Sequence, residues 1–101
     1  MGFQRIDVEK ARELIAQNAL VVDIRDGHSF ANGAMPGAVQ VSGDNIESFV
    51  ADNDKSRPLI VCCYHGNTSQ GAAQYFTERG FKHSYSLDGG YEAWDESEAE
   101  L

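Results

Sequence analysis

The sequence predicts an α/β domain built on a mostly parallel sheet. Short apolar runs alternate with amphipathic stretches along the chain, which is the pattern of strands joined by crossover helices. The runs at residues 20–24 and 59–63 are apolar almost throughout, as expected for strands covered on both faces. With 101 residues, 42% of them hydrophobic and 24% charged, the chain has the size and composition of one globular domain. We therefore expect a single domain over residues 1–101.

Apolar runs bounded by turn residues define the expected strands of this sheet. The fourth run is the most apolar, so we expect it to be the central strand. The runs lie at residues 3–6, 20–24, 39–41, 59–63 and 81–87.

Apolar residues at helical spacing predict the helices between these strands. The first helix is expected to begin after Asp7, which suits an N-cap position, and to end near Asn18. Residues 25–37 are rich in glycine and are expected to be irregular, with room for one short helical turn. The next helix is expected to be capped by Ser42 or Asp44.

Two further helices are expected in the second half of the chain. One follows the fourth strand and is expected to run to about Arg79, before a glycine that ends it. The other is expected to place Tyr91 and Trp94 against the core. The acidic tail at residues 95–100 is expected to be frayed.

The charge balance excludes several classes of partner. The 8 Lys and Arg against 16 Asp and Glu give a net charge of −8, and the basic residues do not cluster. Nucleic acid and anionic membrane surfaces need clustered basic residues, so we expect neither as a partner. No apolar run approaches the roughly 20 residues of a membrane-spanning helix. The N-terminal residues lack the apolar core of an export signal, so we expect a cytoplasmic protein.

Cys63 is the candidate nucleophile. It ends the predicted central strand and precedes a short loop containing Gly66 and then a predicted helix. Ligands bind beyond the carboxyl ends of parallel strands, and a loop of this kind can direct its N–H groups at one point. Together with the helix N-terminus, these donors favour a thiolate, so no general base is required. Cys62, its neighbour, points to the opposite face of the strand and is expected to pack in the core as a free thiol.

Other chemistries fit the sequence less well. A cysteine-dependent phosphatase or arsenate reductase would carry an Arg to clamp its oxyanion where this chain has Ser69. No resolving thiol lies two residues from Cys63, and no spacing typical of zinc ligands occurs, so we expect neither a metal nor a cofactor. His65 either tunes the thiolate or is a solvent-facing loop residue. Arg25 either attracts an anion or, as we expect, pairs with a neighbouring carboxylate.

Three segments, taken in order, resemble the signatures of the rhodanese family of sulfurtransferases. The first covers residues 22–38, although Ala34 stands where the family usually has His. The second is the active-site loop from Cys63 to Thr68, and the third covers residues 87–94. The loop, its continuation and the short length are similar to the family's single-domain thiosulfate sulfurtransferases. The signature-bearing part of the chain extends over about residues 15–97.

This resemblance implies a rhodanese-like fold, a five-stranded sheet flanked by helices on both faces. It also implies a double displacement, in which Cys63 takes sulfane sulfur from thiosulfate as a persulfide, releases sulfite, and passes the sulfur to an acceptor. Cyanide in vitro or a dithiol such as reduced thioredoxin is the implied acceptor. The alternative is a non-enzymatic persulfide carrier or binding module with the same fold. The residues implied to bind the substrate and the persulfide are Tyr64, His65, Gly66, Asn67, Thr68 and Ser69.

Overall fold

A computed structural model of the chain, which describes residues 2–101, contains a five-stranded parallel sheet with the strand order β1-β5-β4-β2-β3. Met1, the first residue of the expected domain, lies outside the described residues. The central position of β4 confirms the expectation from its apolar sequence. The strands are β1 (Gln4–Ile6), β2 (Leu20–Asp23), β3 (Val39–Gln40), β4 (Leu59–Cys62) and β5 (Ser84–Leu87).

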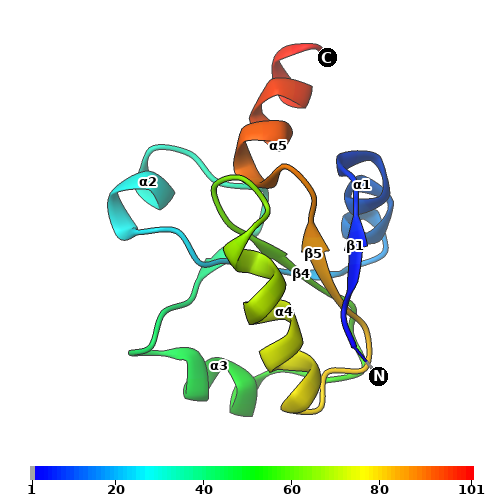
Figure 1. Cartoon of the computed structure of the whole chain (residues 1–101), viewed down its shortest axis with the longest axis vertical. Helices are drawn as coiled ribbons and strands as arrows, with labels where there is room; N and C mark the ends of the chain where they lie inside the picture. Colours follow the sequence, from blue (N-terminus) through cyan, green and yellow to red (C-terminus); the bar gives the residue numbers. More distant parts are fainter. Residues whose placement is uncertain (1) are drawn as a thin grey trace.

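Helices cover both faces of the sheet (Figure 1). Residues of α1 and α5 pack in one hydrophobic cluster, and residues of α3 and α4 pack in the cluster on the other face. The short helix α2 lies in the connection between β2 and β3. The helices are α1 (Val8–Ala16), α2 (Gly27–Ala31), α3 (Ile46–Asp52), α4 (Thr68–Glu78) and α5 (Gly90–Ala99).

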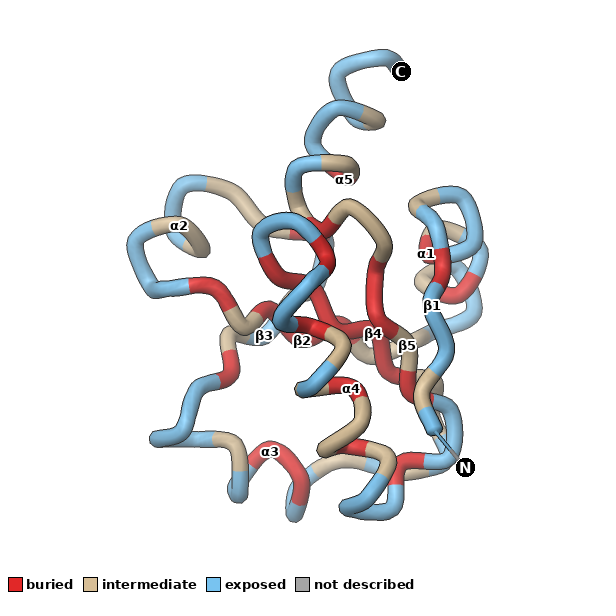
Figure 2. Tube along the Cα trace, in the orientation of Figure 1, coloured by how far each residue is buried: buried red, intermediate tan, exposed pale blue. Residues whose placement is uncertain are grey.

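The strand β4 is buried along its whole length (Figure 2). Its side chains alternate between the two clusters, so Ile60 and Cys62 face α1 and α5 while Leu59 and Val61 face α3 and α4. Three aromatic rings from α3, α4 and the loop before β5 fill the second cluster with edge-to-face and stacked contacts. The core therefore fixes the carboxyl end of β4 from both sides.

The expected start of α1 is confirmed by a side-chain cap, and the expected ends of α1 and α4 are confirmed by the backbone geometry. The Asp7 carboxylate accepts a hydrogen bond from the N–H of Lys10 at 2.8 Å, which caps α1. After α1 the chain turns at Asn18, whose φ of 74° is left-handed. After α4 it turns at Gly80, with a φ of 105°.

The expected cap of α3 is wrong. The N-cap position belongs to Asn45, and neither Ser42 nor Asp44 caps the helix through its side chain. The Ser42 hydroxyl instead accepts from the N–H of Asp44 at 3.3 Å, and the Ser42 N–H donates to the Asn45 side chain at 2.8 Å. These polar side chains are used within the preceding turn, which competes with capping.

The expected fraying of residues 95–100 is also wrong, because α5 continues to Ala99. Arg12 of α1 reaches this segment. Its guanidinium donates to the Ser97 hydroxyl at 2.8 Å, pairs with Glu98 at 2.7 Å, and lies 4.3 Å from the centre of the Trp94 ring. This contact between α1 and α5 holds the acidic segment in helical form.

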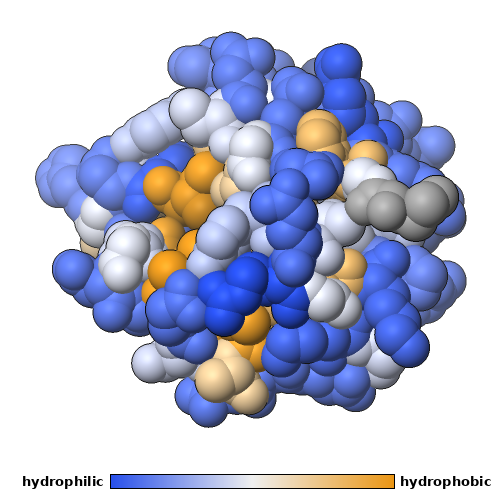
Figure 3. All heavy atoms as spheres, turned by 60° about the horizontal axis from the view of Figure 1, so that its bottom comes forward, coloured by the Kyte–Doolittle hydropathy of each residue, from blue (hydrophilic) through white to orange (hydrophobic). Residues whose placement is uncertain are grey.

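The face shown in Figure 3 is mostly hydrophilic, in keeping with the net charge of −8. Across residues 2–101, every helix is too short or too polar to cross a bilayer. One of the large apolar side chains that remain exposed is Tyr64, which follows Cys63.

Candidate functional site

Cys63 lies directly after β4, at the carboxyl edge of the sheet. The loop that follows leads into α4 at Thr68 and passes between α2 and α5 in the view of Figure 1. Cys63 as a residue is only 2% exposed. The sulfur is therefore set into the loop and is surrounded mainly by atoms of the loop.

Backbone and hydroxyl groups of this loop surround the sulfur. The N–H of Gly66 donates to Sγ at 3.1 Å and the N–H of Ser69 donates at 3.3 Å. The hydroxyl oxygen of Ser69 lies 3.2 Å from Sγ, within hydrogen-bond distance. Ser69 lies in the first turn of α4, so the sulfur also meets the positive end of the helix dipole.

These contacts determine the acidity of the thiol. Burial raises the pKa of Cys63, but hydrogen bonds from the hydroxyls of Ser69 and Thr68 and from the N–H groups of Ser69 and Gly66 outweigh it, and the pKa falls to about 7. A large fraction of Cys63 is therefore thiolate at neutral pH. The hydrogen-bond donors of the loop are sufficient to acidify the thiol, with no contribution from a base.

The backbone of the turn before α5 packs directly against the loop. A Cβ atom at Gly66, where φ is 91°, would lie 2.7 Å from the nitrogen of Gly89. A Cβ atom at Gly90, where φ is 60°, would lie 2.5 Å from the carbonyl oxygen of Cys63. Only glycine fits at both positions.

The first turn of α5 holds two carbonyl groups of the loop. The N–H of Tyr91 donates to the Cys63 carbonyl at 2.7 Å, and the N–H of Glu92 donates to the Tyr64 carbonyl at 3.2 Å. With these acceptors engaged by α5, the loop presents N–H groups to the sulfur.

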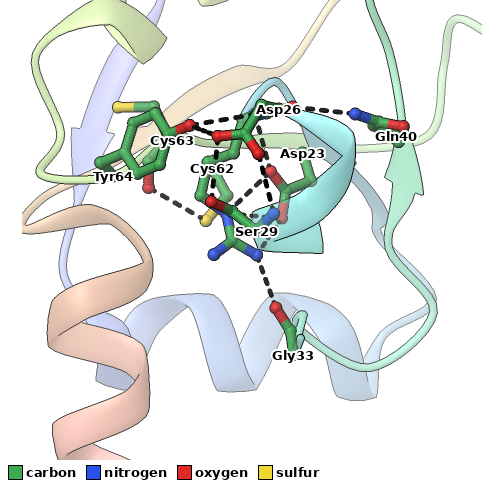
Figure 4. A network of polar contacts seen from close by, with 9 residues as sticks. Asp23, Asp26, Ser29, Gly33, Gln40, Cys62, Cys63 and Tyr64 are labelled. Atoms are coloured by element: carbon green, nitrogen blue, oxygen red, sulfur yellow. Dashed lines mark hydrogen bonds and ion pairs between the residues drawn. The ribbon is translucent and has the colours of Figure 1, made fainter. Parts of the chain in front are cut away.

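Tyr64 ties the loop to α2 (Figure 4). Its hydroxyl donates to the Asp26 carboxylate, and the N–H of Asp26 donates back to the hydroxyl oxygen at 3.2 Å. Asp26 also caps α2 by accepting from the N–H of Ser29 at 2.9 Å. The hydrogen bond from Tyr64, together with those from Ser29, holds the pKa of the Asp26 carboxyl well below its usual range.

The remaining loop residues have separate places. The exposed ring of His65 lies 3.2 Å from the Glu92 carboxylate and makes no hydrogen bond to Cys63 within residues 2–101, which favours the solvent-facing interpretation. Asn67 occupies the N-cap position of α4 without a side-chain cap, and Thr68 begins the helix. Gln70 donates to the carbonyl of Gly66 at 3.0 Å.

Arg25 forms a buried ion pair with Asp23, as expected. Its guanidinium lies 2.8 Å from the Asp23 carboxylate, donates to the carbonyl of Gly33 at 2.6 Å, and lies 4.1 Å from the centre of the Tyr91 ring. Figure 4 shows Asp23 and Gly33 in this network. The positive charge of Arg25 is thus used to hold the long loop after β2.

Cys62 lies on the opposite side of the strand, and the two sulfur atoms point away from each other (Figure 4). It is fully buried in the cluster under α1 and α5, which confirms the expected core position. Burial, reinforced by the charge of Asp23, raises the pKa of Cys62 to about 12. Both cysteines are free thiols, and their acidities differ widely.

Ser86 is the part of this site that sequence reasoning missed. Its hydroxyl lies 2.8 Å from the hydroxyl of Ser69, and both residues are fully buried. One signal was available. Ser84 and Ser86 are polar residues on one face of a strand in a sheet covered on both sides, where apolar side chains are the rule.

Comparisons with known proteins place this geometry in context. A family model described as the rhodanese-like domain matches residues 7–97. The chain is 51% identical over 92 residues to the thiosulfate sulfurtransferase GlpE of Pseudomonas aeruginosa strain LESB58, covering 91% of this chain and 84% of that protein. It is 46% identical over 99 residues to the thiosulfate sulfurtransferase GlpE of Shewanella oneidensis, covering 97% and 98% of the two chains.

Solved structures show the same fold. The human single-domain sulfurtransferase TSTD1 matches with a TM-score of 0.76 at 22% identity, over 94% of this chain and 97% of that one. A rhodanese-like domain protein from Staphylococcus aureus matches with a TM-score of 0.77 at 21% identity, over 91% of both chains.

Proposed function

Because the chain belongs to the rhodanese family, whose domain model matches residues 7–97, we propose that it is a thiosulfate sulfurtransferase with Cys63 as its nucleophile. The observation that carries this proposal is the set of donors around one sulfur: the N–H groups of Gly66 and Ser69 and the hydroxyl of Ser69. The relatives named thiosulfate sulfurtransferase support the choice of donor substrate.

The first half-reaction is the loading of Cys63. The thiolate attacks the outer sulfur of thiosulfate, a new S–S bond forms, and the S–S bond of thiosulfate breaks. The electron pair of the broken bond leaves with sulfite, a dianion, and the enzyme keeps a persulfide with one negative charge. Donors aimed at an anionic sulfur stabilise both the thiolate and this product.

The second half-reaction regenerates the thiolate. An acceptor nucleophile attacks the terminal sulfur of the persulfide, and the electron pair of the S–S bond returns to Cys63. Cyanide gives thiocyanate in this step, and a dithiol such as reduced thioredoxin is the proposed acceptor in the cell. The free thiols of Cys62 and Cys63 fit a reducing cytoplasm, where we place the protein.

The loop residues Tyr64 to Ser69 have two proposed roles. Gly66 and Ser69 bind the sulfur directly, and Thr68 adds a hydroxyl that lowers the pKa of Cys63. Tyr64 holds the loop in place through Asp26. The proposed catalytic domain extends over the described chain, with its functional residues between Asp23 and Glu92.

The proposal is tested by identifying which cysteine sulfur thiosulfate modifies. After incubation with thiosulfate, mass spectrometry is expected to show one added sulfur atom on the peptide at Cys63, removable by cyanide. Cys63→Ser is expected to abolish thiosulfate:cyanide transfer. Cys62→Ser is the matched control, since it changes the adjacent buried thiol, and it is expected to retain most of the activity. An adduct on Cys62 alone would contradict the proposal.

Turnover separates the enzyme from a persulfide carrier. An enzyme releases sulfite continuously while thiosulfate and reduced thioredoxin, the proposed acceptor, are both present. A carrier that does not pass its sulfur to this acceptor would release one equivalent of sulfite per chain and then stop, so a sulfite time course decides between the two.

A further inference from the structure

The buried serine on β5 lies outside the active-site loop but is connected to it. The Ser86 hydroxyl is 2.8 Å from the Ser69 hydroxyl, which in turn lies 3.2 Å from the sulfur of Cys63. We call these three side chains, Ser86, Ser69 and Cys63, the serine relay. Ser69 and Ser86 are fully buried, so water does not compete for the hydrogen bond between them.

The number of hydrogens in the serine relay depends on the charge of Cys63. Its three groups are joined by two contacts, and each contact uses one hydrogen. A neutral thiol brings S–H in addition to the two O–H groups, so one hydrogen is left without an acceptor inside the relay. A thiolate brings none, and both hydroxyl hydrogens are then used.

The thiolate also fixes the direction of both hydrogen bonds. Because the ionised sulfur can only accept, Ser69 must donate its O–H to Sγ. The Ser69 oxygen is then free to accept from the O–H of Ser86, which has no other hydrogen-bond partner within residues 2–101. Aligned in this way, each hydrogen bond polarises the next and strengthens the contact to the anion.

We propose that Ser86 is a positioning residue that acts through Ser69, turning the Ser69 hydroxyl toward the sulfur and favouring the thiolate of Cys63. The inference rests on the proposed function only in taking Cys63 as the nucleophile. It does not depend on which sulfur donor the protein uses.

Ser84 provides a matched control on the same strand. It is two residues away, faces the same side of β5 and is buried, but its hydroxyl donates to the carbonyl of Ala73 at 2.8 Å and takes no part in the relay. Replacing either serine by alanine removes one buried hydroxyl. A purely structural role predicts the same outcome for both variants.

The experiment measures the rate at which iodoacetamide alkylates Cys63 as a function of pH, with the modified peptide identified by mass spectrometry. For Ser86→Ala the rate at pH 6.5 is expected to fall about threefold while the high-pH plateau stays unchanged. For Ser84→Ala the profile is expected to match that of the wild type. A Ser86→Ala profile identical to that of Ser84→Ala would overturn the inference.

A double variant tests the path through Ser69. Once Ser69→Ala has removed the middle hydroxyl, adding Ser86→Ala is expected to leave the alkylation profile unchanged. If the two effects multiply instead, Ser86 acts by another route and the relay is wrong.

A measurement on the wild-type chain covers the case in which Ser86→Ala does not fold. With ¹³Cβ-labelled serine, the resonance of Ser86 is expected to titrate together with Cys63, and that of Ser84 is not. A Ser86 resonance that stays constant through this titration would overturn the proposal. Because alkylation and titration need no thiosulfate, a failed sulfur transfer with a normal Ser86 effect would contradict only the proposed function.

Discussion

Tyr64 and Asp26 are joined by a hydrogen bond although 38 positions separate them in the chain. The bond connects Tyr64, the residue after Cys63, to the cap of α2, so the loop is held at its exposed side. On its other side the loop is held by hydrogen bonds from N–H groups of α5 to two of its carbonyl oxygens. The donors around the sulfur are thus held from two directions.

Replacing Tyr64 by Phe removes the first of these attachments and keeps the ring. We expect kcat/KM for thiosulfate to fall about three- to tenfold, the effect of one hydrogen bond. The pKa of Asp26 is expected to rise, because its largest stabilising contact is lost. Steady-state kinetics and carboxyl ¹³C titration measure the two effects. Tyr75→Phe is the control, since its hydroxyl binds Glu47 of α3. An equal loss of activity in that variant would contradict the assigned role.

The activity is expected to follow the thiolate of Cys63. Since the pKa of this group is lowered to about 7, kcat/KM should be half-maximal near that pH, reach a plateau above it, and fall about tenfold per pH unit below it. The reactive form is the deprotonated one, so acid removes activity. Cys62, with its pKa raised to about 12, does not titrate in this range. A half-maximal activity near pH 9 would show that the loop does not stabilise the anion.

The net charge of −8 predicts an unusual response to salt. Thiosulfate is a dianion and is repelled at long range, and added salt screens this repulsion. We expect kcat/KM for thiosulfate to rise about twofold or more between 10 mM and 200 mM salt. Alkylation of Cys63 by neutral iodoacetamide serves as the control and should not change. A steep fall with salt would instead indicate a steering cation near the site.

Gly90 is expected to tolerate no side chain. Gly90→Ala would place a Cβ 2.5 Å from the Cys63 carbonyl oxygen at a φ of 60°. We expect a loss of about 1–3 kcal/mol in the free energy of unfolding, and lower activity because the loop must shift. Urea denaturation and kinetics measure both effects. Gly71→Ala is the control: a Cβ there meets nothing within 4 Å, and alanine in helix α4 should stabilise by about 0.5–1 kcal/mol.

The parts of the fold that are set by local pattern could be predicted from sequence. β2 and β4 are recognisable because strands covered on both faces are apolar throughout, and α1 because Asp7 caps it. Cys63 could be found because a strand end, a glycine loop and a helix start meet at one residue. The end of α5 could not be predicted, because it depends on Arg12 from another helix.

The same distinction applies within the site. The N–H donors of Gly66 and Ser69 lie within six residues of Cys63, so the loop pattern indicates them. Ser86 is 17 positions from Ser69, and their contact exists only because β5 pairs with β4. Sequence spacing carries no information about such a contact.

The pairing of β5 with both β1 and β4 has a consequence for the order of events during synthesis. Cys63 leaves the ribosome before Ser86 and before the N–H groups of Tyr91 and Glu92 that shape its loop. Until those residues emerge, the loop lacks the contacts from β5 and α5 that hold its donors against the sulfur. The arrangement of donors around the sulfur is therefore complete only once β5 and α5 have joined the rest of the domain.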